Sequence, residues 1–82
     1  MNLADVEREL RRLGVPEGAY AFVPRRGDEQ YLLYEEPRGT WVVSFVERGT
    51  ETFREEFSSE HGACSRFLER IKSDRGVPRR PR

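Results

Sequence analysis

The stretch from Gly39 to Ile71 constrains the fold most strongly, because an apolar strand, a tight turn and an amphipathic helix follow one another in it without interruption. Side chains alternate between the two faces of a strand, and in residues 41–46, WVVSFV, both of the resulting faces are nearly apolar. This pattern is typical of a central strand that is covered at least in part on both sides, or whose outer face meets a partner.

The next strand is predicted to pair with the first through a tight hairpin at Glu47, Arg48 and Gly49. Glycine readily adopts the positive φ angle that so short a connection requires. Beyond the turn, Phe53 and Phe57 share one face of the strand, and polar side chains share the other. Such an alternation indicates a strand that is buried on one side only.

A helix is predicted to follow, since the hydroxyl of Ser58 or Ser59 can accept a hydrogen bond from the free amide groups of a first helical turn. We expect Cys64, the only cysteine, to be a buried structural thiol, and a single cysteine excludes an internal disulfide. The apolar stripe of this helix has the spacing i, i+4 and i+8 and consists of Ala63, Cys64, Phe67, Leu68 and Ile71.

Another helix is predicted at the N-terminus, where Asn2 can cap the chain and apolar residues recur at spacings of three and four. Gly14 stands where a left-handed terminating residue belongs, and Pro16 forbids continuation of the helix. The apolar residues of this helix are Leu3, Val6, Leu10 and Leu13.

Two more strands are predicted between the first helix and the central hairpin, at residues 19–23 and 30–35. We expect residues 25–29 to join them as a polar hairpin and residues 36–39 to form the next turn. The predicted fold is therefore α+β, a two-layer sandwich with an N-terminal helix, an antiparallel meander of three or four strands, and a C-terminal helix on the same face of the sheet.

The chain of 82 residues is long enough for one domain, which we place at residues 1–74, followed by an Arg- and Pro-rich tail at residues 75–82 that we expect to be disordered. Fifteen basic and fifteen acidic residues cancel overall. The tail holds four arginines and no acid, so residues 1–74 carry a net charge of −4. A neutral chain thus divides into an acidic body and a basic tail.

The composition offers little for catalysis. The acids at Glu35 and Glu36, and at Glu55 and Glu56, are neighbours in strands and point to opposite faces, so neither pair converges on a substrate. His61 is most simply a solvated residue of a helix start, and no His and Cys cluster suits a metal. No apolar run has the length of a signal-peptide core or a membrane span. We expect a cytoplasmic protein with no cofactor, no bound metal and no enzymatic activity.

If both helices cover one face of the sheet, the opposite face is left to solvent or a partner and must expose some aromatic side chains. Glutamates on the later strands would surround them. An apolar patch rimmed by charge of one sign is typical of a protein-binding surface. The candidate aromatic side chains are Tyr20 or Phe22, Tyr31 or Tyr34 and, if its set faces away from the helices, Trp41.

Three segments, LRRLGVPEGAY, WVVSFVERG and FSSEHGACSRFLERI, match a pattern in which an aromatic strand enters an E-R-G turn and a helix starts with F-x-S-E-x-x-A-C. Over residues 10–71 the chain resembles the immunity proteins that are encoded beside polymorphic or contact-dependent secreted toxins. The resemblance implies a cytoplasmic protein that needs no cofactor and binds a cognate toxin, commonly a nuclease or nucleotide-consuming enzyme with a cationic cleft. Acids and aromatic anchors could block such a cleft.

Our hypothesis from the sequence is a toxin-neutralising protein that contacts neither nucleic acid nor membrane and is a monomer or weak homodimer when free. The predicted contact residues are Glu35, Glu36, Trp41, Glu47, Arg48, Glu51, Glu55 and Glu56. Two alternatives stay open. One is a small nucleic-acid-associated or regulatory protein that uses the basic tail. The other is an interaction domain that dimerises through the open sheet face or an edge strand.

Overall fold

The computed structural model describes residues 1–24 and 29–74. Two predictions, the turn residues 25–28 and the tail at residues 75–82, therefore lie outside the described residues. The described part contains the short 3-10 helix η1 (Glu17–Ala19) besides its helices and strands. These are α1 (Leu3–Leu13), β1 (Tyr20–Ala21), β2 (Gln30–Glu35), β3 (Trp41–Glu47), β4 (Thr50–Phe57) and α2 (Glu60–Ser73).

The strands form one mixed sheet in the order β1-β2-β3-β4. β2, β3 and β4 pair antiparallel, as predicted. β1 runs parallel to β2, with Tyr20 opposite Tyr31, so the hairpin predicted between these two strands is wrong. The parallel arrangement lets Phe22 pack toward the core, where its ring lies 5.4 Å from that of Tyr20 and 6.2 Å from that of Phe67. The α+β class is confirmed.

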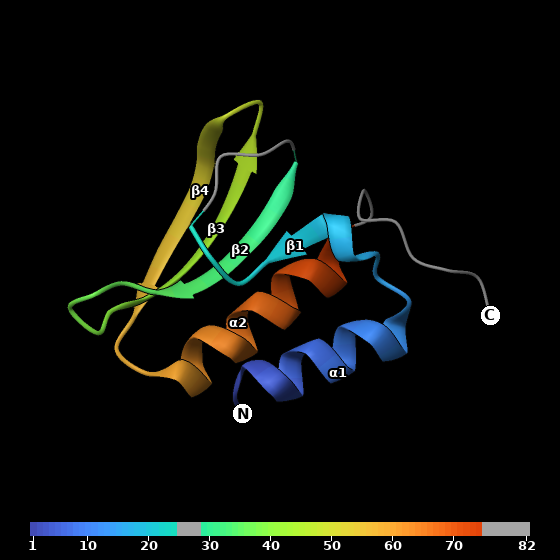
Figure 1. Ribbon diagram of the computed structural model, residues 1–82, viewed down its shortest axis with the longest axis horizontal. Coiled ribbons are helices and arrows are strands. Elements are labelled where there is room, and N and C mark those ends of the chain that lie inside the picture. Colours follow the sequence, from blue (N-terminus) through green and yellow to red (C-terminus); the bar gives the residue numbers. More distant parts are fainter. Residues whose placement is uncertain (25–28, 75–82) are drawn as a thin grey trace.

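Both helices lie on the same side of the sheet, as predicted, and form one layer beside it (Figure 1). α2 packs against β2, β3 and β4, while α1 packs along α2. One apolar cluster joins the two helices to the sheet, and we call it the main core. Its fully buried members include Val6, Leu10, Leu33, Val43, Cys64, Phe67 and Ile71.

Local hydrogen bonds set the ends of both helices. At the start of α1, the side chain of Asn2 accepts a hydrogen bond from the amide of Asp5, and the carboxylate of Asp5 accepts one from the amide of Asn2. Gly14 ends α1 with a φ angle of 76°, in the left-handed region. Ser59 caps α2 by accepting a hydrogen bond from the amide of Gly62. These ends agree with the predictions.

The hairpin between β3 and β4 turns on Arg48 and Gly49, whose φ angles are 53° and 78°. Positive φ at both central residues is characteristic of the two-residue turns whose twist matches that of the strands. The register shifts between Phe45 and Val46, so the pairing closer to the turn differs by one residue from the rest. The turn was predicted, and the register shift was not.

Tyr31 joins β2 to the C-terminal end of α2. Its hydroxyl donates a hydrogen bond of 2.6 Å to the carboxylate of Asp74. Burial of the ring, together with this hydrogen bond, raises the pKa of Tyr31 to about 12. An unfolded tyrosine ionises near pH 10, about two units lower. The folded protein therefore keeps a proton that the unfolded chain loses.

A spectroscopic titration of the tyrosines tests this contact. The contribution of Tyr31 to stability is fully present below about pH 10 and is lost as the pH rises from about 10 to about 12. We expect the phenolate of Tyr31 to appear only near pH 12 in the folded protein, and burial raises the pKa of Tyr20 as well. The substitution Tyr31→Phe should remove this late step and leave the earlier ones in place. Ionisation of every tyrosine near pH 10 in the folded chain would contradict the assignment.

Candidate protein-binding site

The sheet face that points away from the helices, here called the open face, carries a second apolar cluster. Leu32, Tyr34, Val42 and Val46 form it, and Ala21 packs against it. Tyr34 is only 8% exposed, and the other three are at most 2% exposed. The prediction that this face displays exposed aromatic rings is therefore wrong for the described residues, because neighbouring side chains cover the rings and leave mainly polar groups at the surface.

Arg54 is the most important of these covering side chains. It lies on β4, and one of its guanidinium nitrogens donates a hydrogen bond of 3.2 Å to the hydroxyl of Tyr34. Three carboxylates surround the same guanidinium, at 2.8 Å for Glu56, 3.1 Å for Glu36 and 3.8 Å for Glu51. The hydrogen bonds that the guanidinium donates, first to Glu56 and then to Glu36 and the Tyr34 hydroxyl, raise the pKa of Arg54.

We call Glu36, Glu51, Arg54 and Glu56 the acidic cluster. Three carboxylates around one guanidinium give the cluster a net charge of −2. Ion pairs this exposed contribute little to folding stability, since water solvates the separated charges well. The cluster therefore adds a field of excess negative charge to this face and little folding stability.

A groove of about 540 Å³ lies beside the acidic cluster on the open face. Its floor is apolar, because Leu32, Tyr34 and Val46 are the buried residues among those that line it. Its border is polar and carries the carboxylate of Glu51 and the guanidinium of Arg54. The remaining lining residues are Pro24, Gly49 and Thr50.

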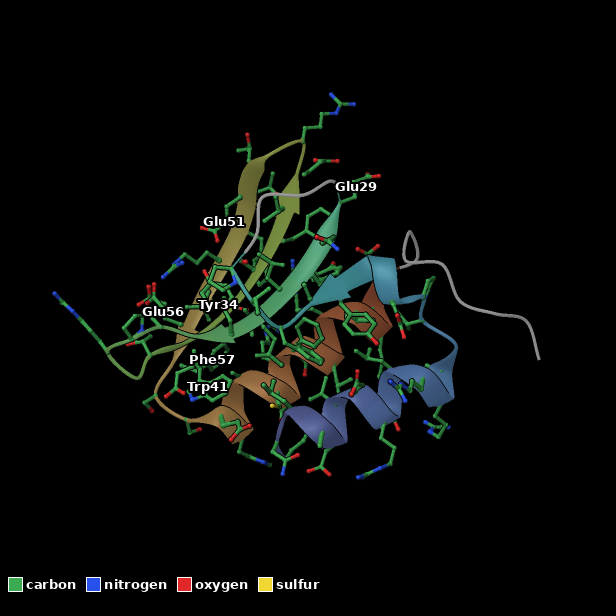
Figure 2. All side chains as sticks on the ribbon, viewed as in Figure 1. Glu29, Tyr34, Trp41, Glu51, Glu56 and Phe57 are labelled. Atoms are coloured by element: carbon green, nitrogen blue, oxygen red, sulfur yellow. The ribbon has the colours of Figure 1, made fainter. Side chains whose placement is uncertain are left out.

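Three of the eight predicted contact residues form the acidic cluster beside this groove, and two more lie at the neighbouring turn. Glu36, Glu51 and Glu56 belong to the acidic cluster. Glu47 and Arg48 lie at the turn between β3 and β4, next to Gly49 in the groove wall. Figure 2 shows Tyr34, Glu51 and Glu56 along the strands, apart from both helices.

The other three predicted contact residues lie on the helical side of the sheet. Trp41 packs against the main core and is only partly exposed. Glu55 is opposite Val43 and accepts a hydrogen bond of 2.7 Å from Arg66 of α2. Glu35 is opposite Trp41 and so shares its side, although it is exposed. The eight residues therefore do not form one surface, and the placement of Trp41 as an exposed anchor is corrected (Figure 2).

Sequence reasoning missed one member of the site, Arg54. The sequence places Arg54 on the polar face of its strand. Glu56 lies two residues further on and therefore on the same face, which indicates that the two side chains can pair. Glu29 is exposed just before β2, and the next residue, Gln30, is opposite Val46. Glu29, labelled in Figure 2, therefore lies at the same end of the sheet as Val46, and it is not among the residues that line the groove or form the acidic cluster.

Other chemistry-bearing residues have structural surroundings. Cys64 is fully buried, and burial, followed by the charge of Glu60, raises the pKa of its thiol to about 11. His61 lies 3.0 Å from the amino group of Met1 through its Nδ1 atom. Within residues 1–24 and 29–74, no group of three or more His, Cys, Asp or Glu side chains could hold a metal ion. No helix in the same residues is long and apolar enough to cross a membrane.

Comparisons of the chain with protein-family models, with curated proteins and with solved structures find no match. The function is therefore inferred from the chemistry of the open face.

Proposed function

We propose that this chain is a cytoplasmic immunity protein that binds a cognate toxin through its open face and thereby neutralises it. The groove carries this proposal, because its apolar floor is bordered by an acidic cluster with excess negative charge. A concave surface with excess negative charge beside it suits a partner of opposite charge. The resemblance of residues 10–71 to immunity proteins supports the same function.

The groove suits a lysine or arginine side chain of the toxin. The aliphatic part of such a side chain would lie in the groove while its cation reached Glu51. Glu51 is the carboxylate that Arg54 holds least closely, at 3.8 Å, so its oxygens have the most capacity to accept a new hydrogen bond. An enzyme that acts on nucleic acid or nucleotides needs cations in its cleft, and occupying them would block its substrate.

The charge of the whole domain favours the same partner. Residues 1–74 carry a net charge of −4, and Glu29 and Glu47 extend the negative charge beyond the acidic cluster. A field of one sign speeds the encounter with a cationic protein, and this gain falls as salt screens the charges. We propose a binding mode in which association is fast and salt-sensitive, and in which a side chain of the partner is then buried in the groove.

Co-purification tests the proposal. The chain would be co-expressed with the product of the adjacent gene, with an affinity tag on this chain alone, and washed in high salt before elution. We expect a stoichiometric complex, because packing in the groove persists after the long-range attraction is screened. The partner should stop growth when it is expressed alone. Elution of the chain by itself, or with only RNA that the salt removes, would contradict the proposal and favour binding through the basic tail.

A further inference from the structure

β4 is an unpaired edge of the sheet. It is the last strand in the order β1-β2-β3-β4, and within the described residues only β3 pairs with it. Figure 1 shows it at the margin of the sheet opposite β1. β4 has eight residues, whereas the other edge strand has two. An edge of this length presents free amide and carbonyl groups that can pair with another strand.

The sequence of β4 is complementary to itself in the antiparallel direction. When two copies are aligned with Glu55 opposite Glu55, Arg54 of each copy faces Glu56 of the other. In the same register, Phe53 of each copy faces Phe57 of the other. Opposite charges and aromatic pairs are the directly opposed partners that stabilise antiparallel strands. Alignment about Arg54 instead would oppose two arginines and place Phe53 against Glu55.

We propose that the chain forms a homodimer through β4, with the two strands antiparallel about a two-fold axis at Glu55. The two four-stranded sheets would then join into one continuous sheet. A symmetric contact of this kind repeats each favourable pair twice. The inference goes beyond the proposed function, since it concerns a second copy of this chain instead of a toxin, although Arg54 and Glu56 of the acidic cluster take part in both.

On the open face, the charged side chains of β4 suit this pairing. Arg54 and Glu56 of one copy are 2.8 Å apart on this face, and Arg54 also reaches Glu36 and the hydroxyl of Tyr34. A second copy would add the same two groups in reverse order. The four side chains would then alternate in sign along the seam, while Glu36 and Glu51 keep each acidic cluster negative.

The side chains of β4 that face the helices suit the same pairing. Phe53 and Phe57 are only partly buried on the main core, and the guanidinium of Arg70 lies 3.9 Å from the centre of the Phe53 ring. The partner copy would cover both rings with its own. The two Glu55 side chains would meet at the axis, but each is paired with Arg66 at 2.7 Å, which offsets their mutual repulsion.

A charge-swap experiment tests the dimer and its register. We expect the wild-type chain to change from monomer to dimer in sedimentation velocity between about 1 µM and about 1 mM. In a homodimer of Arg54→Glu, residue 54 of each copy would face Glu56 of the other, so glutamate would face glutamate. In a homodimer of Glu56→Arg, arginine would face arginine. Each variant should therefore remain monomeric. An equal mixture of the two should form a heterodimer, because every cross-strand pair then has opposite charges. A wild-type chain that is monomeric throughout, or a mixture of folded variants that does not associate, would overturn the proposal.

A cysteine at the axis gives a second test that leaves Arg54 in place, should Arg54→Glu prevent folding. In Glu55→Cys the two thiols would lie on directly opposed residues, about 4.5–5.5 Å apart between Cα atoms, which a disulfide can span. We expect mild oxidation to yield a covalent dimer. Thr52→Cys is the matched control, since its two copies would lie far apart along the strands. The native Cys64 is buried and should not cross-link. Equal cross-linking of both variants, or of neither, would overturn the register.

Discussion

Replacing Phe67 with alanine is expected to lower the free energy of unfolding by about 3–5 kcal/mol. Phe67 is fully buried in the main core, and its ring lies 6.2 Å from Phe22 and 6.4 Å from Tyr31, edge-on to the latter. It thus contacts both β2 and the segment after β1. A domain of this size is stable by only about 4–12 kcal/mol, so the variant should be close to unfolding. Denaturant titration followed by circular dichroism measures the loss.

Phe53→Ala serves as the matched control, because the same truncation at the partly buried edge of β4 removes less packing. We expect it to cost about 1–2 kcal/mol in dilute solution. If Phe67→Ala cost no more than Phe53→Ala, the packing of α2 on the sheet described above would be wrong. The mixed sheet would then need another source of stability.

Reversing two charges of the acidic cluster should have the largest effect on binding. In Glu36→Lys with Glu51→Lys, the border of the groove changes from negative to positive, while Arg54 keeps its partner Glu56. We expect the rate of association with the toxin to fall about 100-fold at low salt, since attraction becomes repulsion. Stopped-flow or surface-based kinetics at several salt concentrations would measure it.

The control for this variant makes the same charge change on the helical side. Glu7 and Glu69 are each paired with an arginine, Arg11 and Arg66, so Glu7→Lys with Glu69→Lys also breaks two ion pairs. This control should associate much faster than the cluster variant. Equal losses in the two variants would mean that only the total charge matters, and the open face would lose its assignment as the binding site.

The sequence predicts the two helices closely because their ends depend on contacts within a single turn. Asn2 and Asp5 exchange two hydrogen bonds across three residues. At the second helix, the hydroxyl of Ser59 accepts one hydrogen bond from the amide of Gly62. The β3 to β4 hairpin is equally local, since it needs only the positive φ angles at its turn. Elements of this kind are set by neighbouring residues and can be read from the sequence.

The direction of β1 depends on distant residues and is not predictable in the same way. Turn-forming residues between the two strands favour a hairpin. The observed parallel pairing instead places Phe22 beside Phe67, which comes from the other end of the chain. A two-residue strand carries too little pattern to specify its own direction.

The site is predicted in part for a related reason. Acidic residues on the later strands are visible in the sequence, and three of them do gather around Arg54. The face that each strand turns to the helices is not visible, because β3 is apolar on both sides. Contact with α2 decides which face of the strand turns to the helices, and this contact places Trp41 and Glu55 away from the groove. Tyr34 was predicted as an exposed candidate and is buried under Arg54.

The measurement that tests toxin neutralisation most directly is the survival of cells that make the toxin. Cells that also make this chain should grow, and so should cells that make the Glu7→Lys, Glu69→Lys control at the same level. Cells with the Glu36→Lys, Glu51→Lys variant should be protected much less, because slower association leaves the toxin free for longer. Equal killing with and without the wild-type chain, at matched and verified protein levels, would contradict the proposed function.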